Sequence, residues 1–220
     1  MTEIVIRLSA VLLVTLVYAA PLCQGAKDEE GFVSLFDGKT LQGWTLDGAE
    51  GNGFVVEEGT LVCPQGSVGN LYTTHEYANF VLRLQYRMSA GGNNGVAIRA
   101  PGHGRASSVG MEIQIIDNDH PMWKRLRPEQ LDGSIYDVVA AQPGHNRGPG
   151  QWNDLEIAAD KRQVTVRLNG AVILDSDLNS ITDPKVLEKH PGLRRPSGLI
   201  GLLGHETRVE FRAVRVKRLP

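Results

Sequence analysis

The stretch FVLRLQYRM, residues 80–88, decides the fold class of this chain. Every second residue, beginning with Phe80, is apolar, whereas Arg83, Gln85 and Arg87 stand at intervening positions. Because the side chains of a β-strand point alternately to the two faces of a sheet, a period of two is typical of a strand with one face in a core and the other in water. We therefore expect residues 80–88 to form a half-buried strand.

The same alternation recurs further along the chain. It is present in MEIQI at residues 111–115 and in QVTVRL at residues 163–168. The second of these segments is followed by Asn169-Gly170, a pair favoured in tight hairpin turns. Residues 171–174 are therefore the expected return strand.

Two further features complete the strand pattern. Residues 54–57 and 60–63 are expected to pair as a hairpin through Glu58-Gly59. Near the C-terminus, the apolar positions of residues 209–216 change parity at Arg212-Ala213. A change of parity within one strand predicts a bulge of one residue.

Helical periodicity is absent from the sequence, apart from one helical turn that we expect at residues 184–190. Many short strands with glycine-rich turns predict an all-β chain, a two-sheet antiparallel β-sandwich of the jelly-roll, concanavalin-like type. We assign it to one domain, residues 32–220. Three longer connections, residues 100–110, 117–133 and 141–151, interrupt the strands, and binding residues are expected there.

The overall composition excludes some classes of partner. The chain has 220 residues, of which 41% are hydrophobic and 22% are charged, so it can bury a full core without disulfides. Its formal net charge of -2 provides no field that would attract nucleic acid or an anionic membrane. Neither is expected as a partner.

The N-terminus has the pattern of a secretory signal. Arg7 precedes an apolar run, residues 8–20, that is too short to span a bilayer comfortably. We assign residues 1–25 to a signal peptide and residues 26–31 to a polar leader. The sequence thus predicts export to the periplasm or the extracellular space, with no transmembrane segment after removal of the signal.

We expect different roles for the two cysteines, Cys23 and Cys63. Cys23 follows the apolar run, but Leu22 stands where a lipoprotein signal requires a small residue, so we do not expect a lipid anchor. If Cys23 is removed with the signal peptide, Cys63 has no partner for a disulfide. It is then expected to be a buried, unreactive thiol.

Several catalytic motifs are absent: the sequence has no P-loop, HExxH, GxSxG or Cys pair with metal-ligand spacing. What remains is a set of polar residues on the non-core parity of strands. In residues 94–99 the apolar side chains supply the core face, so Arg99 is expected on the other face, as are Glu112 and Gln114 in their own strand. If the two strands share a sheet, a guanidinium, a carboxylate and an amide converge over small residues. The alternative is a solvated face with surface ion pairs.

Asp117 is a second carboxylate close to Glu112 in the sequence. An offset of five residues puts the two side chains on opposite faces of a continuous strand, which disfavours the carboxylate pair, about 5–9 Å apart, of ordinary glycosidases. We interpret residues 117–120 as the opening of a loop in which Asp117 caps a turn. A calcium site is the alternative there, although the spacing is not that of an EF-hand loop.

Three further residues are candidates for contact with a ligand. His205 follows GLIGLLG, residues 198–204, a glycine-punctuated strand that a ligand could approach closely. Tyr136 is a candidate hydroxyl donor, or else a core aromatic residue with a solvated tip. Trp123, within the loop after Asp117, is a candidate for stacking on a sugar ring, or else an anchor for that loop.

These residues belong to a larger set of motifs that resembles the 3-keto-disaccharide hydrolase family. The blocks that carry the resemblance are LFDGKTL at 35–41 with Gly43-Trp44, GNNGVAIR at 92–99, MEIQIIDN at 111–118, GSIY at 133–136, GQWN at 150–153, LNG at 168–170 and GLLGH at 201–205. The resemblance implies a concanavalin-like jelly roll and a hydrolase that acts on glycosides oxidised to a ketone at C3. It also implies that the pocket residues are Arg99, Glu112, Gln114, Tyr136 and His205.

The chemistry implied by the resemblance needs three groups. A 3-keto group acidifies the proton on C2, so the substituent on C1 can leave by elimination before water adds back. This requires a base at C2, a donor for the enolate oxygen and an acid for the leaving oxygen. We assign Glu112 as the base, Arg99 as the enolate stabiliser and His205 or Tyr136 as the acid. The further candidate substrate contacts are Gln114, Asn94, Trp123 and Asp117. A divalent metal in place of Arg99 is the alternative electrophile.

Two other functions remain alternatives to a 3-keto-glycoside hydrolase. One is a non-catalytic carbohydrate-binding module, which would expose aromatic residues along an open groove without clustered ionisable groups. Aromatic residues make up only 6% of the chain, and Arg99, Glu112 and His205 favour a charged pocket and hence an enzyme. The other is an ordinary glycoside hydrolase, which the parity of Glu112 and Asp117 disfavours. In all three cases the expected partner is a small carbohydrate.

Overall fold

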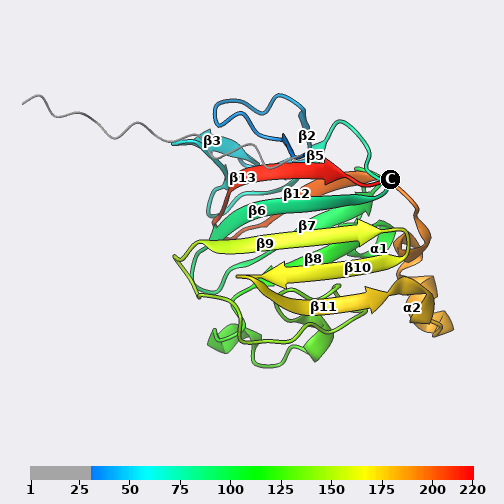
Figure 1. Ribbon diagram of the computed structural model, residues 1–220. Coiled ribbons are helices and arrows are strands. Elements are labelled where there is room, and N and C mark those ends of the chain that lie inside the picture. Colours follow the sequence, from blue (N-terminus) through cyan, green and yellow to red (C-terminus); the bar gives the residue numbers. More distant parts are fainter. Residues whose placement is uncertain (1–30) are drawn as a thin grey trace, which may run out of the picture.

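The computed structural model describes residues 31–220, which form two antiparallel β-sheets packed face to face (Figure 1). The predicted signal peptide, most of the polar leader and Cys23 lie outside these described residues. Within them, no helix is long and apolar enough to cross a membrane. The prediction of an all-β, two-sheet antiparallel sandwich is confirmed.

The larger sheet has eight strands and faces the viewer in Figure 1. Its order is β11-β10-β9-β6-β13-β4-β3, and β1 pairs with β13. The strands are β1 (Val33–Ser34), β3 (Val55–Glu57), β4 (Thr60–Cys63), β6 (Phe80–Met88), β9 (Asn153–Asp160), β10 (Gln163–Leu168), β11 (Ala171–Asp177) and β13 (Val209–Arg218).

The smaller sheet has five strands in the order β2-β5-β12-β7-β8 and lies behind the larger one in Figure 1. Its strands are β2 (Trp44–Glu50), β5 (Val68–Thr73), β7 (Asn93–Ala100), β8 (Met111–Ile116) and β12 (Leu199–His205). Within residues 31–220, helical structure is limited to α1 (Ala106–Val109), α2 (Pro184–Lys189) and the 3-10 turns η1 (Pro121–Trp123), η2 (Pro128–Gln130), η3 (Leu178–Ser180) and η4 (Pro191–Arg194). The expected turn at residues 184–190 is therefore present, whereas α1 lies in a segment for which we expected a loop.

The strand from which the sequence analysis started is β6, with the expected bounds. Burial alternates strictly along it, because Phe80 and every second residue after it enter the core between the two sheets. The opposite sheet contributes Ile113 and Ile115 from β8 and Leu202 from β12 to the same core. Cys63 is fully buried at the end of β4, and burial raises the pKa of its thiol to about 11, as expected for an unreactive cysteine.

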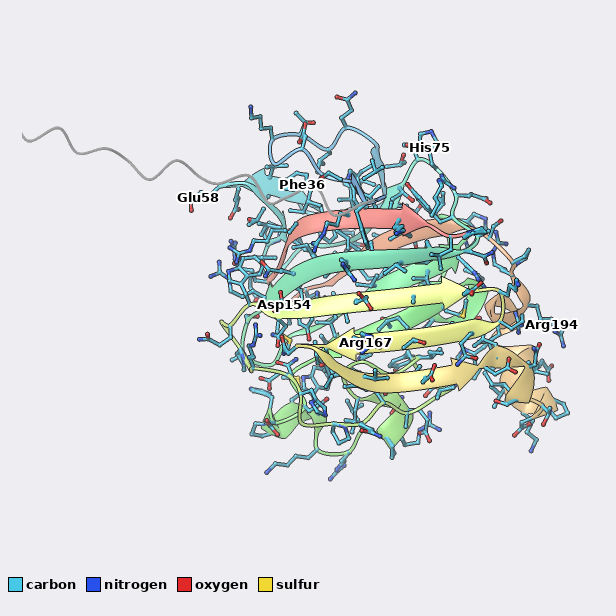
Figure 2. All side chains as sticks on the ribbon, in the orientation of Figure 1. Phe36, Glu58, His75, Asp154, Arg167 and Arg194 are labelled. Carbon is cyan, nitrogen blue, oxygen red and sulfur yellow. The ribbon has the colours of Figure 1, made fainter. Side chains whose placement is uncertain are left out.

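The predicted turns are also confirmed. Asn169 and Gly170 join β10 to β11 with φ of 51° and 89°, the left-handed conformations that a two-residue hairpin of this kind requires. Glu58, whose side chain points outward in Figure 2, has φ of 45° in the β3–β4 turn. The register of β13 on β6 shifts between Arg212 and Arg215, and Ala213 has φ of 52°, which is the expected bulge.

A second, smaller apolar cluster covers the outer face of the five-stranded sheet, the face turned away from the viewer in Figure 1. Its members are Tyr72, Ala97, Ala100, Ala106 and Leu203. Ala106 belongs to α1, so this short helix packs on the outside of the sheet. The cluster leaves the neighbouring part of the same face open for a pocket.

Candidate active site

The pocket is built on the pairing of β7 with β8. Glu112 and Gln114 point to the outer face of β8, opposite Ala97 and Gly95 of β7. A Cβ atom at Gly95 would lie 2.6 Å from Oε1 of Glu112, so only glycine leaves room for this carboxyl group. The small residues of β7 thus form the floor over which the Glu112 side chain extends.

The space above this floor is a cavity of about 150 Å³. Its walls come from six segments: β5, β7, the segment of α1, β8, the loop that contains Tyr136, and β12. The lining residues are Asn70, Asn93, Arg105, Ala106, Glu112, Gln114, Tyr136, Leu203 and His205. Four of the predicted site residues, Glu112, Gln114, Tyr136 and His205, are therefore together in one pocket.

Glu112 is the acidic residue of this pocket, and the pKa of its carboxyl group is raised. Its residue surface is 8% exposed, and burial raises the pKa of the carboxyl group from 4.5 to about 7. The positive charge of Arg105 and a hydrogen bond from the Ser107 hydroxyl oppose that rise. Arg105 Nε in turn donates to Ser107 Oγ at 3.0 Å. A carboxyl group with a pKa near neutrality can both accept and return a proton at physiological pH.

His205 lies at the end of β12, where the strand reaches the mouth of the pocket. Desolvation and the nearby Arg105 guanidinium lower the pKa of its imidazole. His205 also lines a second cavity next to this one, as does Asn93. These two side chains therefore mark the border between the two cavities.

Gln114 and Tyr136 supply uncharged polar groups. Gln114 is 2% exposed; its Nε2 donates to Asn93 Oδ1 at 3.1 Å, but its Oε1 has no hydrogen-bond partner among residues 31–220. The hydroxyl of Tyr136 accepts a hydrogen bond from Gln130 Nε2 at 3.2 Å. Since buried polar atoms are nearly always paired, the unpaired oxygen of Gln114 favours a bound ligand or water in this pocket.

Arg99 is not in the pocket, contrary to our prediction from parity. Its φ is 50°, and the pairing of β7 with β12 shifts register here, so the alternation stops before Arg99. The fully buried guanidinium donates from Nε and Nη2 to the carbonyl oxygen of Ala78, at 3.0 and 2.8 Å. Arg99 therefore joins two segments of the backbone and does not contact the pocket.

Two other predicted contacts also lie outside the pocket. Asn94 pairs with Ile115 on the core face of the sheet, and its Oδ1 accepts from the hydroxyl of Thr207 at 3.2 Å. Asp117 follows the end of β8, and its Oδ2 accepts from the backbone N–H of Gly91 at 2.9 Å. Asp117 therefore caps the turn between β6 and β7 and not its own loop, where we expected the cap, and it forms no carboxylate pair with Glu112 in the pocket. Among residues 31–220, no group of three or more His, Cys, Asp or Glu side chains is placed to hold a metal ion.

The sequence analysis missed five residues of the pocket, of which three are polar. Asn93 has the parity of Gln114, so a strict count along β7 would have selected it in place of Asn94. Asn70 lies on β5 and reaches the pocket because β5 and β12 are neighbours in the sheet. Arg105 precedes α1, and no local pattern in residues 100–110 indicates that this segment folds back over the sheet.

Comparison with known proteins gives a consistent result. A curated protein of Bacteroides thetaiotaomicron, named 3-keto-disaccharide hydrolase, is 27% identical over 87% of this chain and 80% of its own length. A crystal structure of a candidate glycosyl hydrolase from Parabacteroides distasonis has a TM-score of 0.74 at 25% identity, covering 86% of this chain and 99% of that one.

A Bacillus subtilis protein with a galectin-like fold is 11% identical, with a TM-score of 0.57 over 81% of this chain and 90% of that one, which shows the fold alone. The family model of the 3-keto-alpha-glucoside-1,2-lyase-like domain matches residues 31–217, which is most of the chain. The chain belongs to this family, whose description names a domain like a 3-keto-alpha-glucoside-1,2-lyase.

Proposed function

We propose that this protein cleaves the glycosidic bond of 3-keto-glycosides and that Glu112 is the base that removes the proton from C2. Family membership makes the chain a hydrolase of the 3-keto-disaccharide class. The observation that carries the assignment of Glu112 is its place in the pocket, with a pKa of about 7 caused by burial. An acidified C–H next to a ketone is a suitable substrate for such a base.

The reaction proceeds in two stages. In the first, the C2–H bond breaks, its proton moves to Glu112, and the electron pair passes to the C3 oxygen as an enolate. The enolate then collapses to restore the ketone, a C1=C2 double bond forms, and the C1–O bond breaks. In the first stage the leaving oxygen takes a proton from the acid of the site; in the second stage water adds at C1, its released proton restores that acid, and Glu112 returns a proton to C2. The sum is hydrolysis without an external oxidant, which accounts for both "lyase" and "hydrolase" in the names of relatives.

Arg105 takes the role that we had assigned to Arg99. It lines the pocket beside Glu112, and its charge lowers the pKa of both Glu112 and His205, so it lies within electrostatic reach of both groups. A guanidinium in this position stabilises the negative charge on the enolate oxygen. His205 or Tyr136 supplies the proton that the leaving oxygen requires, because both line the same pocket.

We also propose that the protein is exported. The proposal depends on the apolar run at residues 8–20 and the polar residues that follow it. An exported enzyme of this class would meet its keto-sugars in the periplasm or outside the cell. Cell fractionation and N-terminal sequencing of the mature chain test it: a mature N-terminus near residue 26 supports export, and a cytoplasmic chain beginning at Met1 contradicts it.

The proposed reaction is tested with a 3-keto-glucoside and its unoxidised parent. We expect the wild-type protein to release 3-keto-glucose from the first substrate only. The Glu112→Gln variant should lose about 10²–10⁴-fold in kcat, because it keeps the shape of the side chain but removes the base. Glu156→Gln is the matched control, since this carboxylate lies on the other sheet and pairs with Arg83 at 2.6 Å.

Full activity of Glu112→Gln would contradict the assignment of the base. Binding of sugar without turnover of either substrate would instead favour a carbohydrate-binding module. Comparable turnover of the unoxidised parent would favour an ordinary glycoside hydrolase.

A further inference from the structure

A second cavity, of about 630 Å³, adjoins the pocket of Glu112. It lies where the loop after β8 passes the turn that leads from β12 to β13. The residues that line it are Gln65, Val68, Ala90, Gly91, Asn93, His120, Met122, Trp123, His205, Glu206 and Thr207. We call it the outer groove. It shares Asn93 and His205 with the first pocket, so the two spaces are adjacent.

The volumes of the two cavities suggest that each holds a different part of the substrate. Small-molecule sites in proteins usually have about 300–1,000 Å³. The pocket around Glu112, at about 150 Å³, is small for two linked rings, whereas the outer groove falls within that range. The outer groove is therefore the adjoining space in which a substrate whose reacting ring is at Glu112 can place its other part, past His205.

Trp123 gives the outer groove a preformed aromatic wall. The indole Nε1 donates to the carbonyl oxygen of Gly91 at 3.2 Å, which fixes the ring against the backbone. The N–H of Gly91 donates to Asp117 Oδ2 at 2.9 Å, so the same short segment is held from both sides. Trp123 itself is only partly buried, and the neighbouring Met122 is 66% exposed. An aromatic ring held in place and still open to solvent is suited to stack on a ligand at little entropic cost.

We propose that the outer groove binds the leaving group of the substrate, and that Trp123 selects leaving groups that present the apolar face of a six-membered ring. This inference rests on the proposed function, because it places C1 at the border marked by His205. Two sources share the required chemistry, a second pyranose and an aryl aglycone. In either case the departing oxygen lies next to His205, which suits the assignment of this residue as its proton donor.

The test compares three 3-keto-glucosides that differ only in the leaving group: methyl, glucosyl and 4-nitrophenyl. The measured quantity is kcat/KM for each ring-bearing substrate divided by kcat/KM for the methyl glucoside. In Trp123→Ala we expect this ratio to fall about tenfold relative to wild type. Intrinsic differences between the leaving groups cancel, because each substrate is compared between variant and wild type. Trp123→Phe should restore most of the ratio.

Trp152→Ala is the matched control. This tryptophan immediately precedes β9 of the eight-stranded sheet and contacts the guanidinium groups of Arg87 and Arg212, so its replacement should leave the ratio unchanged. A fall with the glucosyl substrate identifies a sugar as an accepted occupant, and a fall with the 4-nitrophenyl substrate identifies an aryl group; either supports the proposal. An unchanged ratio for both substrates in a folded, active Trp123→Ala variant overturns it. If wild-type protein turns over none of the three, the proposed function itself has failed.

Discussion

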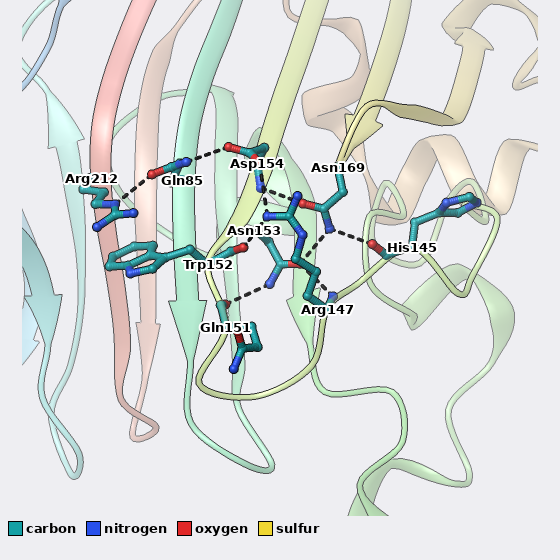
Figure 3. Close-up of polar contacts among 9 residues, drawn as sticks. All are labelled: Gln85, His145, Arg147, Gln151, Trp152, Asn153, Asp154, Asn169 and Arg212. Atoms are coloured by element: carbon teal, nitrogen blue, oxygen red, sulfur yellow. Dashed lines mark hydrogen bonds and ion pairs between the residues drawn. The ribbon is translucent and has the colours of Figure 1, made fainter. Parts of the chain in front are cut away.

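The loop around Asn153 and the pocket around Glu112 both bury amide groups, but they satisfy them to different degrees. Asn153 is fully buried at the start of β9, and all of its polar atoms are paired, as Figure 3 shows. Its Oδ1 accepts from Arg147 N and from Asn169 Nδ2, both at 2.8 Å, and its Nδ2 donates to Gln151 O at 3.2 Å. In the pocket, Gln114 is equally hidden but leaves Oε1 without a partner among residues 31–220.

Among the motifs that carry the family resemblance, this contrast distinguishes those with a structural role from those that form the pocket. GQWN at residues 150–153 and LNG at 168–170 meet in the Asn153 network, which holds a long loop against the end of the eight-stranded sheet. The motifs around Glu112 and His205 instead converge on a pocket with an unpaired acceptor and a carboxyl group of raised pKa. Other buried polar atoms without a partner among residues 31–220, such as Arg99 Nη1 and His190 Nε2, lie outside this pocket, so the site is marked by the unpaired Gln114 oxygen together with the raised pKa of Glu112.

The largest expected effect concerns the two arginines. Arg105→Gln removes the guanidinium that faces the developing enolate, so kcat/KM on a 3-keto-glucoside should fall about 10²–10³-fold, the usual cost of losing one such donor. Thermal unfolding should change little, because Arg105 is exposed and makes two weak contacts, a bond from Nε to the Ser107 hydroxyl and a guanidinium position 5.8 Å from the centroid of the Tyr136 ring. Steady-state kinetics and the melting temperature measure the two quantities.

Arg99→Met is the variant to compare with Arg105→Gln, because Arg99 is the fully buried arginine of the two. It leaves the Ala78 carbonyl oxygen without its donor, so the melting temperature should fall while kcat/KM per folded molecule stays within a fewfold of wild type. If Arg99→Met abolished turnover in folded protein while Arg105→Gln did not, the two roles would be reversed and our original assignment from parity would stand.

The two arginines also show how much of the fold and of the site can be predicted from the sequence alone. Strict alternation, as in β6, and turn residues with a conformational requirement, such as Asn169-Gly170, predicted the sandwich, because these are local properties. The same alternation correctly put Glu112 and Gln114 on the outer face. It failed at Arg99, where a bulge with φ of 50° ends the alternation and nothing in the residue types announces it.

Arg105 could not be predicted because its position depends on tertiary contacts. The carbonyl oxygen of Ser107 accepts a hydrogen bond from His190 Nδ1 at 2.7 Å, and Ser108 Oγ donates to the carbonyl oxygen of Lys189 at 2.8 Å. These bonds tie α1 to a segment some eighty residues later, and they place the preceding Arg105 over the pocket. Long-range contacts of this kind leave no period or spacing in the sequence.

The next largest expected effect is the change in stability and in activity with pH that the titration of Glu112 causes. Its folded pKa of about 7 lies above the ordinary value of 4.5, so the folded state binds this proton more tightly than the unfolded state does. The contribution of Glu112 to stability is therefore fully present below about pH 4.5 and is lost as the pH rises through 7. The full loss corresponds to roughly 3 kcal/mol. Catalysis runs in the opposite direction, because only the deprotonated carboxylate is a base, so kcat/KM should rise through the same window.

Glu112→Gln separates this titration from the rest of the protein. Urea denaturation of the variant and of wild type between pH 5 and 8 should show the variant gaining stability relative to wild type as the pH rises. A difference in the free energy of unfolding that is flat over this window would mean that Glu112 has an ordinary pKa, and the pocket would lose its proposed base.

The smallest expected effect tests the contrast between the two amides directly. Asn153→Leu and Gln114→Met each replace an amide with an apolar group of similar shape. The first removes the acceptor of Arg147 N and one of the two acceptors of Asn169 Nδ2, which keeps its bond to the carbonyl oxygen of His145, so we expect a loss of about 2 kcal/mol in the free energy of unfolding and unchanged turnover per folded molecule. The second removes only one protein hydrogen bond, to Asn93, and eliminates an unpaired acceptor, so stability should stay within about 1 kcal/mol while turnover falls. If the costs were reversed, with Gln114 the stabilising amide and Asn153 dispensable, the unpaired oxygen would lose its meaning as a mark of the binding site.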